Sequence, residues 1–145
     1  MAGRLSYLAE RFGLLHKDQI GERLQRSAID AVMALTHEIE DAKRHKKIVS
    51  TLFMDVKGAF DNVSRDRLLH TMKELRIPAQ LTTWVSHFLT FRTTALAFDG
   101  QREDLQPIQT GIPQGSPASP ILFLLYIKPL FDVLNKKLPL VWTPS

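Results

Sequence analysis

The chain contains no cysteine among its 145 residues, so neither a disulfide framework nor a thiolate zinc site can form within it. Its longest apolar run, 121–127, ends at Lys128 and Pro129, well short of the roughly 20 residues that span a bilayer. The first residues lack the basic and then apolar order of a secretory signal. We therefore expect a soluble, intracellular protein without a membrane partner, and the sequence does not distinguish nucleus from mitochondrion.

The composition is that of one folded domain, with 44% hydrophobic and 23% charged residues. Nineteen Lys and Arg against fifteen Asp and Glu give a net charge of +4. A basic surface favours contact with a polyanion, but many soluble domains are equally basic. Charge alone therefore does not assign a partner.

Apolar spacing and capping signals predict five helices, over 3–13, 27–43, 64–77, 78–88 and 119–134. Ser27 and Asp30 have the spacing of a capping box. In the helix that they begin, Ile29, Val32 and Met33 recur on one face, which predicts that this face packs inward.

Two further segments have strand character. Residues 48–56 are almost wholly apolar, which predicts a strand buried on both faces with Asp55 at its C-terminal end. Residues 92–98 and 105–109 lie on either side of Asp99 and Gly100, a turn dipeptide typical of a hairpin. Pro107 places the second of these strands at an edge.

Asp55 lies in the segment LFMDVKGAFDNV (52–63), where an apolar run delivers one carboxylate and then breaks into a small-residue turn. A carboxylate with a neighbouring backbone carbonyl, here Val56, supplies part of a cage of hard oxygens for Mg²⁺ or Mn²⁺. The remaining oxygens must come from elsewhere. The alternative is that Asp55 only caps the turn and that Asp61 solvates it.

This segment resembles the first palm motif of reverse transcriptases, especially those of non-LTR retrotransposons and group II introns. It matches that motif at Asp55, at Ala59 and Phe60, and at Asp61. The resemblance implies that Asp55 is a catalytic metal ligand and that Phe60 packs against the incoming sugar, where its bulk excludes a 2′-hydroxyl. An ordinary core phenylalanine is the alternative for Phe60.

The stretch GIPQGSPASP (111–120) resembles the second palm motif of the same family. The resemblance implies that Gln114 and Gly115 line the nucleotide site, and a structural turn is the alternative. Residues 19–27 resemble the family's finger segment and keep Arg23 and Arg26 in place. Because guanidinium groups bind phosphate oxygens through paired donors, these arginines are predicted to position the incoming triphosphate, although Glu22 would repel phosphate if it faced the site.

The resemblance implies an α/β (α+β) fold, an incomplete fingers-palm of a right-hand polymerase that is mostly helical with a small sheet. It implies a single partial reverse transcriptase domain over 1–145, divided into fingers-like residues (about 1–47), the first palm motif (48–63), helices and a hairpin (64–109), and the second palm motif with its helix (110–134). The family's third palm motif, an aromatic-x-Asp-Asp hairpin, and the thumb are not found in the sequence.

The function implied is that of a fragment of an RNA-directed DNA polymerase, a nucleotidyltransferase that adds deoxynucleotides to a primer 3′-hydroxyl by two-metal catalysis. Its implied partners are an RNA template, a DNA primer and deoxynucleoside triphosphates. With one of the catalytic aspartates present, we expect weak Mg²⁺ binding and negligible primer extension by this chain alone.

Two alternatives stay open. The chain could be a catalytically dead retroelement remnant that at most binds nucleic acid, or a non-enzymatic helical interaction domain. For the second of these, aggregation or dimerisation through the unpaired edge of the strand at 48–54 is expected.

Overall fold

The computed structural model of the protein describes residues 1–23 and 25–137. In these residues it contains five helices, α1 (Ala2–Arg11), α2 (Ala28–Arg44), α3 (Arg65–Glu74), α4 (Ala79–Leu89) and α5 (Ser119–Lys137). The described part also contains four two-residue strands, β1 (Thr93–Thr94), β2 (Ala97–Phe98), β3 (Gln101–Arg102) and β4 (Gln106–Pro107). The expected mixture of helices with a small amount of sheet is confirmed at this level.

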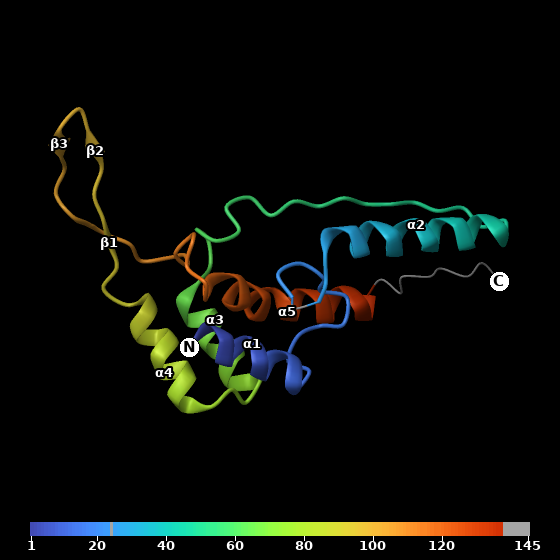
Figure 1. Cartoon of the computed structure of the whole chain (residues 1–145), viewed down its shortest axis with the longest axis horizontal. Coiled ribbons are helices and arrows are strands. Elements are labelled where there is room, and N and C mark those ends of the chain that lie inside the picture. The colour runs from blue at the N-terminus through green and yellow to red at the C-terminus, as the bar shows by residue number, and fades with distance from the viewer. Residues whose placement is uncertain (24, 138–145) are drawn as a thin grey trace.

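Four of the helices share one hydrophobic core. Helix α3 packs against α4 and α5, and α1 packs against α5 (Figure 1). The side chains that they bury completely include Leu5, Leu68, Met72, Leu122 and Leu125. Because burial of each such side chain contributes about 1.5–3 kcal/mol, this cluster holds the molecule's body together.

Local capping explains where the helices begin. The Ser27 amide donates to Asp30 Oδ2 (2.6 Å) and the Asp30 amide to Ser27 Oγ (3.2 Å), so the predicted capping box is confirmed. Ser64 Oγ accepts from the Arg67 amide at the start of α3, and Pro78 precedes α4. The side chains of Ser27 and Ser64 thereby satisfy backbone donors that a helix leaves unpaired in its first turn.

The predicted burial of the α2 face is wrong. The helix forms, but none of its residues is buried, and Ile29, Val32 and Met33 are 63–70% exposed. Figure 1 shows α2 beside the extended chain that follows it, away from the body of α1, α3 and α4. Amphipathic spacing indicates which face is apolar, but the burial of that face depends on a partner surface, which the described residues do not supply.

The predicted buried strand at 48–56 is also wrong. These residues are extended without strand pairing, and side chains such as Ile48 and Phe53 are 97% and 82% exposed. An isolated strand does not form because its amides and carbonyls need a neighbouring strand as partner, and none of the described strands pairs with it. Asp55 therefore lies in an exposed extended segment rather than at the end of a buried strand.

The predicted hairpin is confirmed and projects from the body (Figure 1). Strand β1 pairs with β4 and β2 with β3, both antiparallel. Asp99 and Gly100 both have positive φ (+52° and +76°), as a type I′ turn requires. The register shifts by one residue between the two pairs, so the second strand contains a bulge that adds local twist.

Among the described residues, no helix is long and apolar enough to cross a membrane.

Candidate functional site

The two segments that carry the motifs lie against each other. The Gly111 amide donates to the Val63 carbonyl and the Ile112 amide to the Phe60 carbonyl, both at 2.9 Å. These hydrogen bonds join the turn after Asp55 to the Gly/Pro loop before α5. The structure thus brings together Phe60 and the Gly/Pro loop that contains Gln114 and Gly115.

Gly111 lies at the closest point of this junction. Its φ is +81°, and a Cβ atom there would lie 2.8 Å from the carbonyl oxygen and 3.0 Å from the Cα of Asp61. Real Cβ atoms do not approach backbone this closely. Glycine is therefore required at position 111 for two independent reasons. The backbone there is left-handed, and the Asp61 backbone leaves no room for a side chain.

The turn itself is closed by Asn62. The Asn62 amide donates to the Gly58 carbonyl at 2.9 Å, and its side-chain amide donates to the Lys57 carbonyl at 3.1 Å. Gly58 has a φ of +60°. These contacts fix the bend that carries Phe60 toward α5.

Phe60 stacks on Phe123 of α5, with ring centroids 5.3 Å apart and planes inclined by 26°. Both rings are half-buried and pack against the core. One face of the Phe60 ring is therefore supported by α5. Both a ring that contacts the sugar and an ordinary core phenylalanine would have this support, so the role of Phe60 as a steric gate stays a prediction.

Gln114 and Gly115 are exposed at an open turn. Gly115 has a φ of +81°, and a Cβ there would meet nothing within 4 Å. Behind them, Ser119 Oγ donates to the Pro113 carbonyl at 2.6 Å and ties the loop to the first turn of α5. The loop is fixed at its base and leaves the Gln114 amide open to solvent.

Asp55 and Val56 are also exposed, so the carboxylate is not sealed in the core against a basic partner. Among the described residues, no group of three or more His, Cys, Asp or Glu could hold a metal ion. Asp55 and the Val56 carbonyl are hard oxygen donors of the kind that Mg²⁺ prefers. The donor type fits a divalent cation, and the remaining ligands would be water, substrate and other residues.

Arg23 is engaged in a different contact from the one predicted. Its Nε and Nη2 donate to the two carboxylate oxygens of Glu10 at 2.8 and 2.6 Å, and Nη1 donates to the carbonyls of His16 and Gln19. Arg26 is exposed and donates to the Lys17 carbonyl. None of these contacts is to the Phe60 turn or the Gly/Pro loop, and the predicted phosphate contacts of both arginines stay predictions.

The Arg23–Glu10 pair shifts both groups toward their charged forms. The hydrogen bond from Arg23 lowers the pKa of Glu10 below its ordinary value of 4.5, against the opposing effect of burial. The same bond raises the pKa of Arg23. The pair anchors the segment after α1 to that helix.

Sequence reasoning missed two structural contacts near these segments. Arg92 Nη1 donates to the Gly111 carbonyl at 2.8 Å and so links the base of the hairpin to the Gly/Pro loop. Gln19 is buried, and its side-chain amide donates to the Leu124 carbonyl of α5 at 2.9 Å. The position of Arg92 at the start of the hairpin was visible in the sequence, but no local signal pointed to its distant acceptor.

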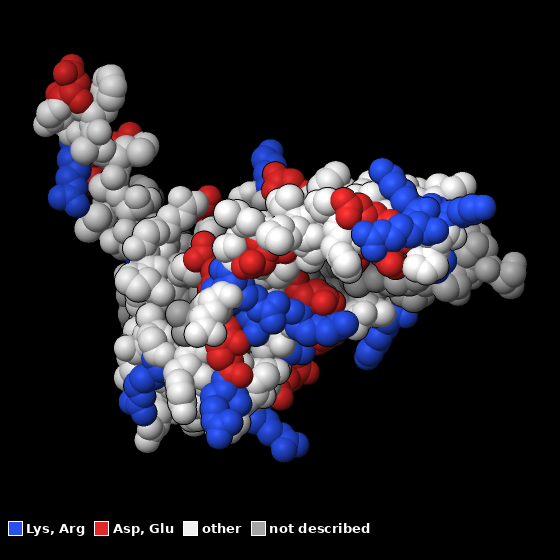
Figure 2. All heavy atoms as spheres, turned by 45° about the vertical axis from the view of Figure 1, so that its right-hand side comes forward, with Lys and Arg blue, Asp and Glu red and all other residues white. Residues whose placement is uncertain are grey.

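Charge on the surface is mixed. Figure 2 shows Lys and Arg interspersed with Asp and Glu over the face in view, with no separation of the two signs into large areas. The net charge of +4 is therefore not gathered into one basic area on that face. Small groups of arginines are better indicators of an anion-binding site than the total charge.

The sequence is similar to those of known proteins. The family model described as "Reverse transcriptase (RNA-dependent DNA polymerase)" matches residues 1–142. An RNA-directed DNA polymerase from the mobile element jockey of Drosophila melanogaster is 34% identical over 110 residues, which cover 76% of this chain and 12% of that protein. A Pol polyprotein from the type-1 retrotransposable element R2 of Popillia japonica is 27% identical over 108 residues, which cover 74% of this chain and 18% of that protein.

A probable RNA-directed DNA polymerase from transposon X-element of Drosophila melanogaster is 27% identical over 126 residues, which cover 87% of this chain and 14% of that protein. No solved structure matches the chain. The chain belongs to the reverse transcriptase family, a family of RNA-dependent DNA polymerases. It spans less than a fifth of the length of each of these relatives.

Replacement of Gly111 by Ala tests the close approach of the two segments. Gly111→Ala should lower the free energy of unfolding by about 1–3 kcal/mol more than Gly115→Ala, because both variants strain a left-handed backbone but only the first collides with Asp61. Urea unfolding followed by circular dichroism measures both. Equal losses for the two variants would show that the junction does not depend on contact at Gly111.

Acid should weaken the Arg23–Glu10 pair. Because the pKa of Glu10 is lowered in the folded state, its contribution is fully present above the ordinary value and is lost as pH falls through the folded value. Glu10→Gln should cost about 1 kcal/mol at pH 7 and remove this part of the pH dependence. The control is Glu22→Gln, which removes an exposed carboxylate next to Arg23 in the sequence, and urea unfolding between pH 7 and pH 3 is the measurement. Parallel pH profiles for wild type and Glu10→Gln would contradict the assignment.

Proposed function

We propose that this chain forms the part of an RNA-directed DNA polymerase that receives the incoming deoxynucleotide and contributes one catalytic carboxylate. The observation that carries the proposal is the pair of backbone hydrogen bonds joining the Phe60 turn to Gly111 and Ile112. These bonds place the two segments that resemble the first and second palm motifs against each other. Family membership supports the polymerase reaction, and the contact between the two segments supports the position of the nucleotide site.

In this proposal, Asp55 and the Val56 carbonyl hold divalent metal, Mg²⁺ or Mn²⁺. The bound metals would activate the primer 3′-hydroxyl and stabilise the leaving pyrophosphate. Asp55 is exposed and ready to accept a cation without first breaking a buried ion pair. Its proposed part in the chemistry is to supply negative charge that holds the metal beside the reacting phosphate.

Phe60 is proposed to select the sugar. Its stacking on Phe123 resists displacement of the ring, so a 2′-hydroxyl that overlapped it could not simply push it aside. A deoxy sugar would rest on the same apolar surface without penalty. This differential contact is what discrimination between two substrates requires.

Gln114 and Gly115 are proposed to line the same nucleotide site. The Gln114 amide offers both a donor and an acceptor, and it is exposed on a loop whose base is fixed. Arg26, also exposed, is the more available of the two predicted triphosphate ligands. Arg23 could bind phosphate only by exchanging Glu10 for it.

The proposed partners are an RNA template, a DNA primer and deoxynucleoside triphosphates. The exposed apolar residues of 48–56 favour pairing of this segment with another strand, in the same polymerase or in a second copy. A catalytically dead remnant that only binds nucleic acid would share these features but would not bind metal at Asp55. Metal binding therefore distinguishes the polymerase fragment from the remnant.

Replacement of Asp55 should weaken metal binding. Mn²⁺ bound to the protein, measured by electron paramagnetic resonance, should show at least about a tenfold loss of affinity in Asp55→Asn, because loss of even an outer ligand partner costs 10–100-fold. The matched control is Asp99→Asn at the hairpin turn. Unchanged Mn²⁺ affinity in Asp55→Asn would refute the assignment of the ligand.

Loss of the Phe60 ring should reduce sugar discrimination. With Mn²⁺ present, equilibrium binding of a deoxynucleoside triphosphate should exceed that of the matching ribonucleotide, and Phe60→Ala should reduce this preference roughly tenfold. Phe60→Tyr keeps the ring and should keep the preference. Discrimination that survives Phe60→Ala, with the fold intact by circular dichroism, would mean that Phe60 serves packing alone.

A further inference from the structure

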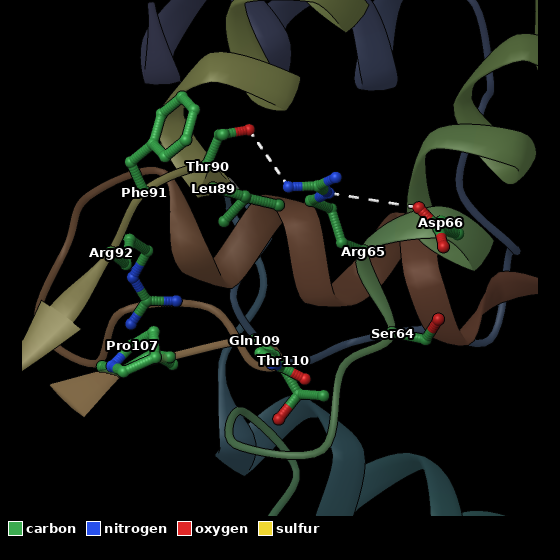
Figure 3. Close-up of a pocket in the computed structure, with 11 residues that line it drawn as sticks. Ser64, Arg65, Asp66, Leu89, Thr90, Phe91, Arg92, Pro107, Gln109 and Thr110 are labelled. Carbon is green, nitrogen blue, oxygen red and sulfur yellow. Dashed lines mark hydrogen bonds and ion pairs between the residues drawn. The ribbon is translucent and has the colours of Figure 1, made fainter.

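A groove lies between the base of the hairpin and the start of α3 (Figure 3), and no residue of the turn at 57–63 lines it. It has a volume of about 640 Å³. Figure 3 shows Arg65 and Arg92 on opposite sides of it, with Phe91 beside Arg92 at its edge. The other polar side chains around it include Thr90, Gln109 and Thr110.

Phe91 is unusual in both its exposure and its backbone. Its side chain is 98% exposed, so it contributes nothing to the core. Its φ is +54°, a left-handed conformation that is unfavourable for a bulky residue. The strained backbone destabilises the fold, and the exposed ring contributes no packing that would offset this, which points to a role outside folding.

The ordinary explanation for such a backbone does not apply to Phe91. Lys46 and Arg76 also have positive φ, but each directly follows a helix C-cap, where this conformation is a common way to end a helix. Phe91 instead follows Thr90, a C-cap that is already extended (ψ 151°). The positive φ of Phe91 is therefore not part of the left-handed helix ending seen at Lys46 and Arg76, and the residue lies almost fully in solvent.

Each arginine is fixed by one contact and keeps donors available. Arg65 Nη1 donates to Thr90 Oγ1 at 3.1 Å, and Arg92 Nη1 donates to the Gly111 carbonyl at 2.8 Å. A guanidinium has five donors, so both groups can bind an anion without losing these anchors. Asp66, 4.0 Å from Arg65 Nε, has its side chain almost fully in solvent, and the arginines outnumber it.

We propose that this groove binds single-stranded nucleic acid, with one base stacked on Phe91 and backbone phosphates contacted by Arg65 and Arg92. Stacking on an exposed ring beside arginines is how proteins bind single strands without reading their sequence. The proposal extends the proposed function, since the Arg92–Gly111 bond connects the groove to the Gly/Pro loop of the nucleotide site. A strand lying in the groove would continue toward that loop.

The test measures binding of a fluorescein-labelled single-stranded oligonucleotide to the purified 145-residue protein by fluorescence anisotropy over a series of salt concentrations. Phe91→Ala should weaken binding roughly 5- to 150-fold, the loss typical of one base stack, without changing the salt dependence. Arg65→Gln should weaken binding and reduce the slope of log affinity against log salt by about 0.7, the value for one phosphate contact on a single strand.

Matched controls lie outside the groove. Phe12→Ala removes another exposed phenylalanine, on α1's C-cap, and Arg67→Gln removes an exposed arginine from the same helix as Arg65. Both should bind within about twofold of wild type. Phe91→Ala should bind Mn²⁺ as tightly as wild type, so failure of the catalytic proposal and failure of this one give different results.

Phe91→Gly separates function from folding. Relief of the left-handed strain should keep or raise the melting temperature, while affinity falls as in Phe91→Ala and Phe91→Trp retains it. RNA and DNA oligonucleotides should bind within a few-fold of each other, because phosphates and base faces are common to both. Wild-type protein that binds neither oligonucleotide would overturn the proposal, and so would Phe91→Ala or Phe91→Gly protein that binds as tightly as wild type.

Discussion

The rest of the site depends on the backbone of Gly111. Its amide donates to the Val63 carbonyl, its carbonyl accepts from Arg92, and its missing side chain leaves room for Asp61. The turn after Asp55, the hairpin and the loop before α5 therefore meet at one residue. Because both polar groups of that residue are paired and no Cβ can be added, the arrangement permits little sliding of one segment against another.

Features whose partners lie within a few residues were predictable from the sequence. The capping box of Ser27 and Asp30, and the turn at Asp99 and Gly100, need only neighbouring groups to form. Features that depend on distant partners were not. The α2 face and segment 48–56 carry apolar patterns that demand cover, and a pattern of side chains does not say whether the covering surface is present.

The same division applies to the site. Phe60 and the Gly/Pro loop were predicted as parts of one site from their motifs, and the structure joins the segments that carry them. Arg23 was predicted as a phosphate ligand, but its pairing with Glu10 depends on how the segment after α1 folds back on the helix. Arg92 and Phe91 were invisible as functional candidates because the first acts on a distant carbonyl and the second is distinguished by its backbone angle.

Among the described residues, segment 48–56 lacks two kinds of partner, a neighbouring strand and further metal ligands. Segment 48–56 has an extended backbone without a paired strand, and Asp55 within it lacks companion carboxylates for a metal pair. One additional strand would supply both. Pairing would satisfy the backbone amides and carbonyls of 48–56, and side chains on the new strand would place further oxygens beside Asp55. The apolar side chains on either side of Asp55 would then become buried, so formation of the metal site and burial of this segment would be one coupled event.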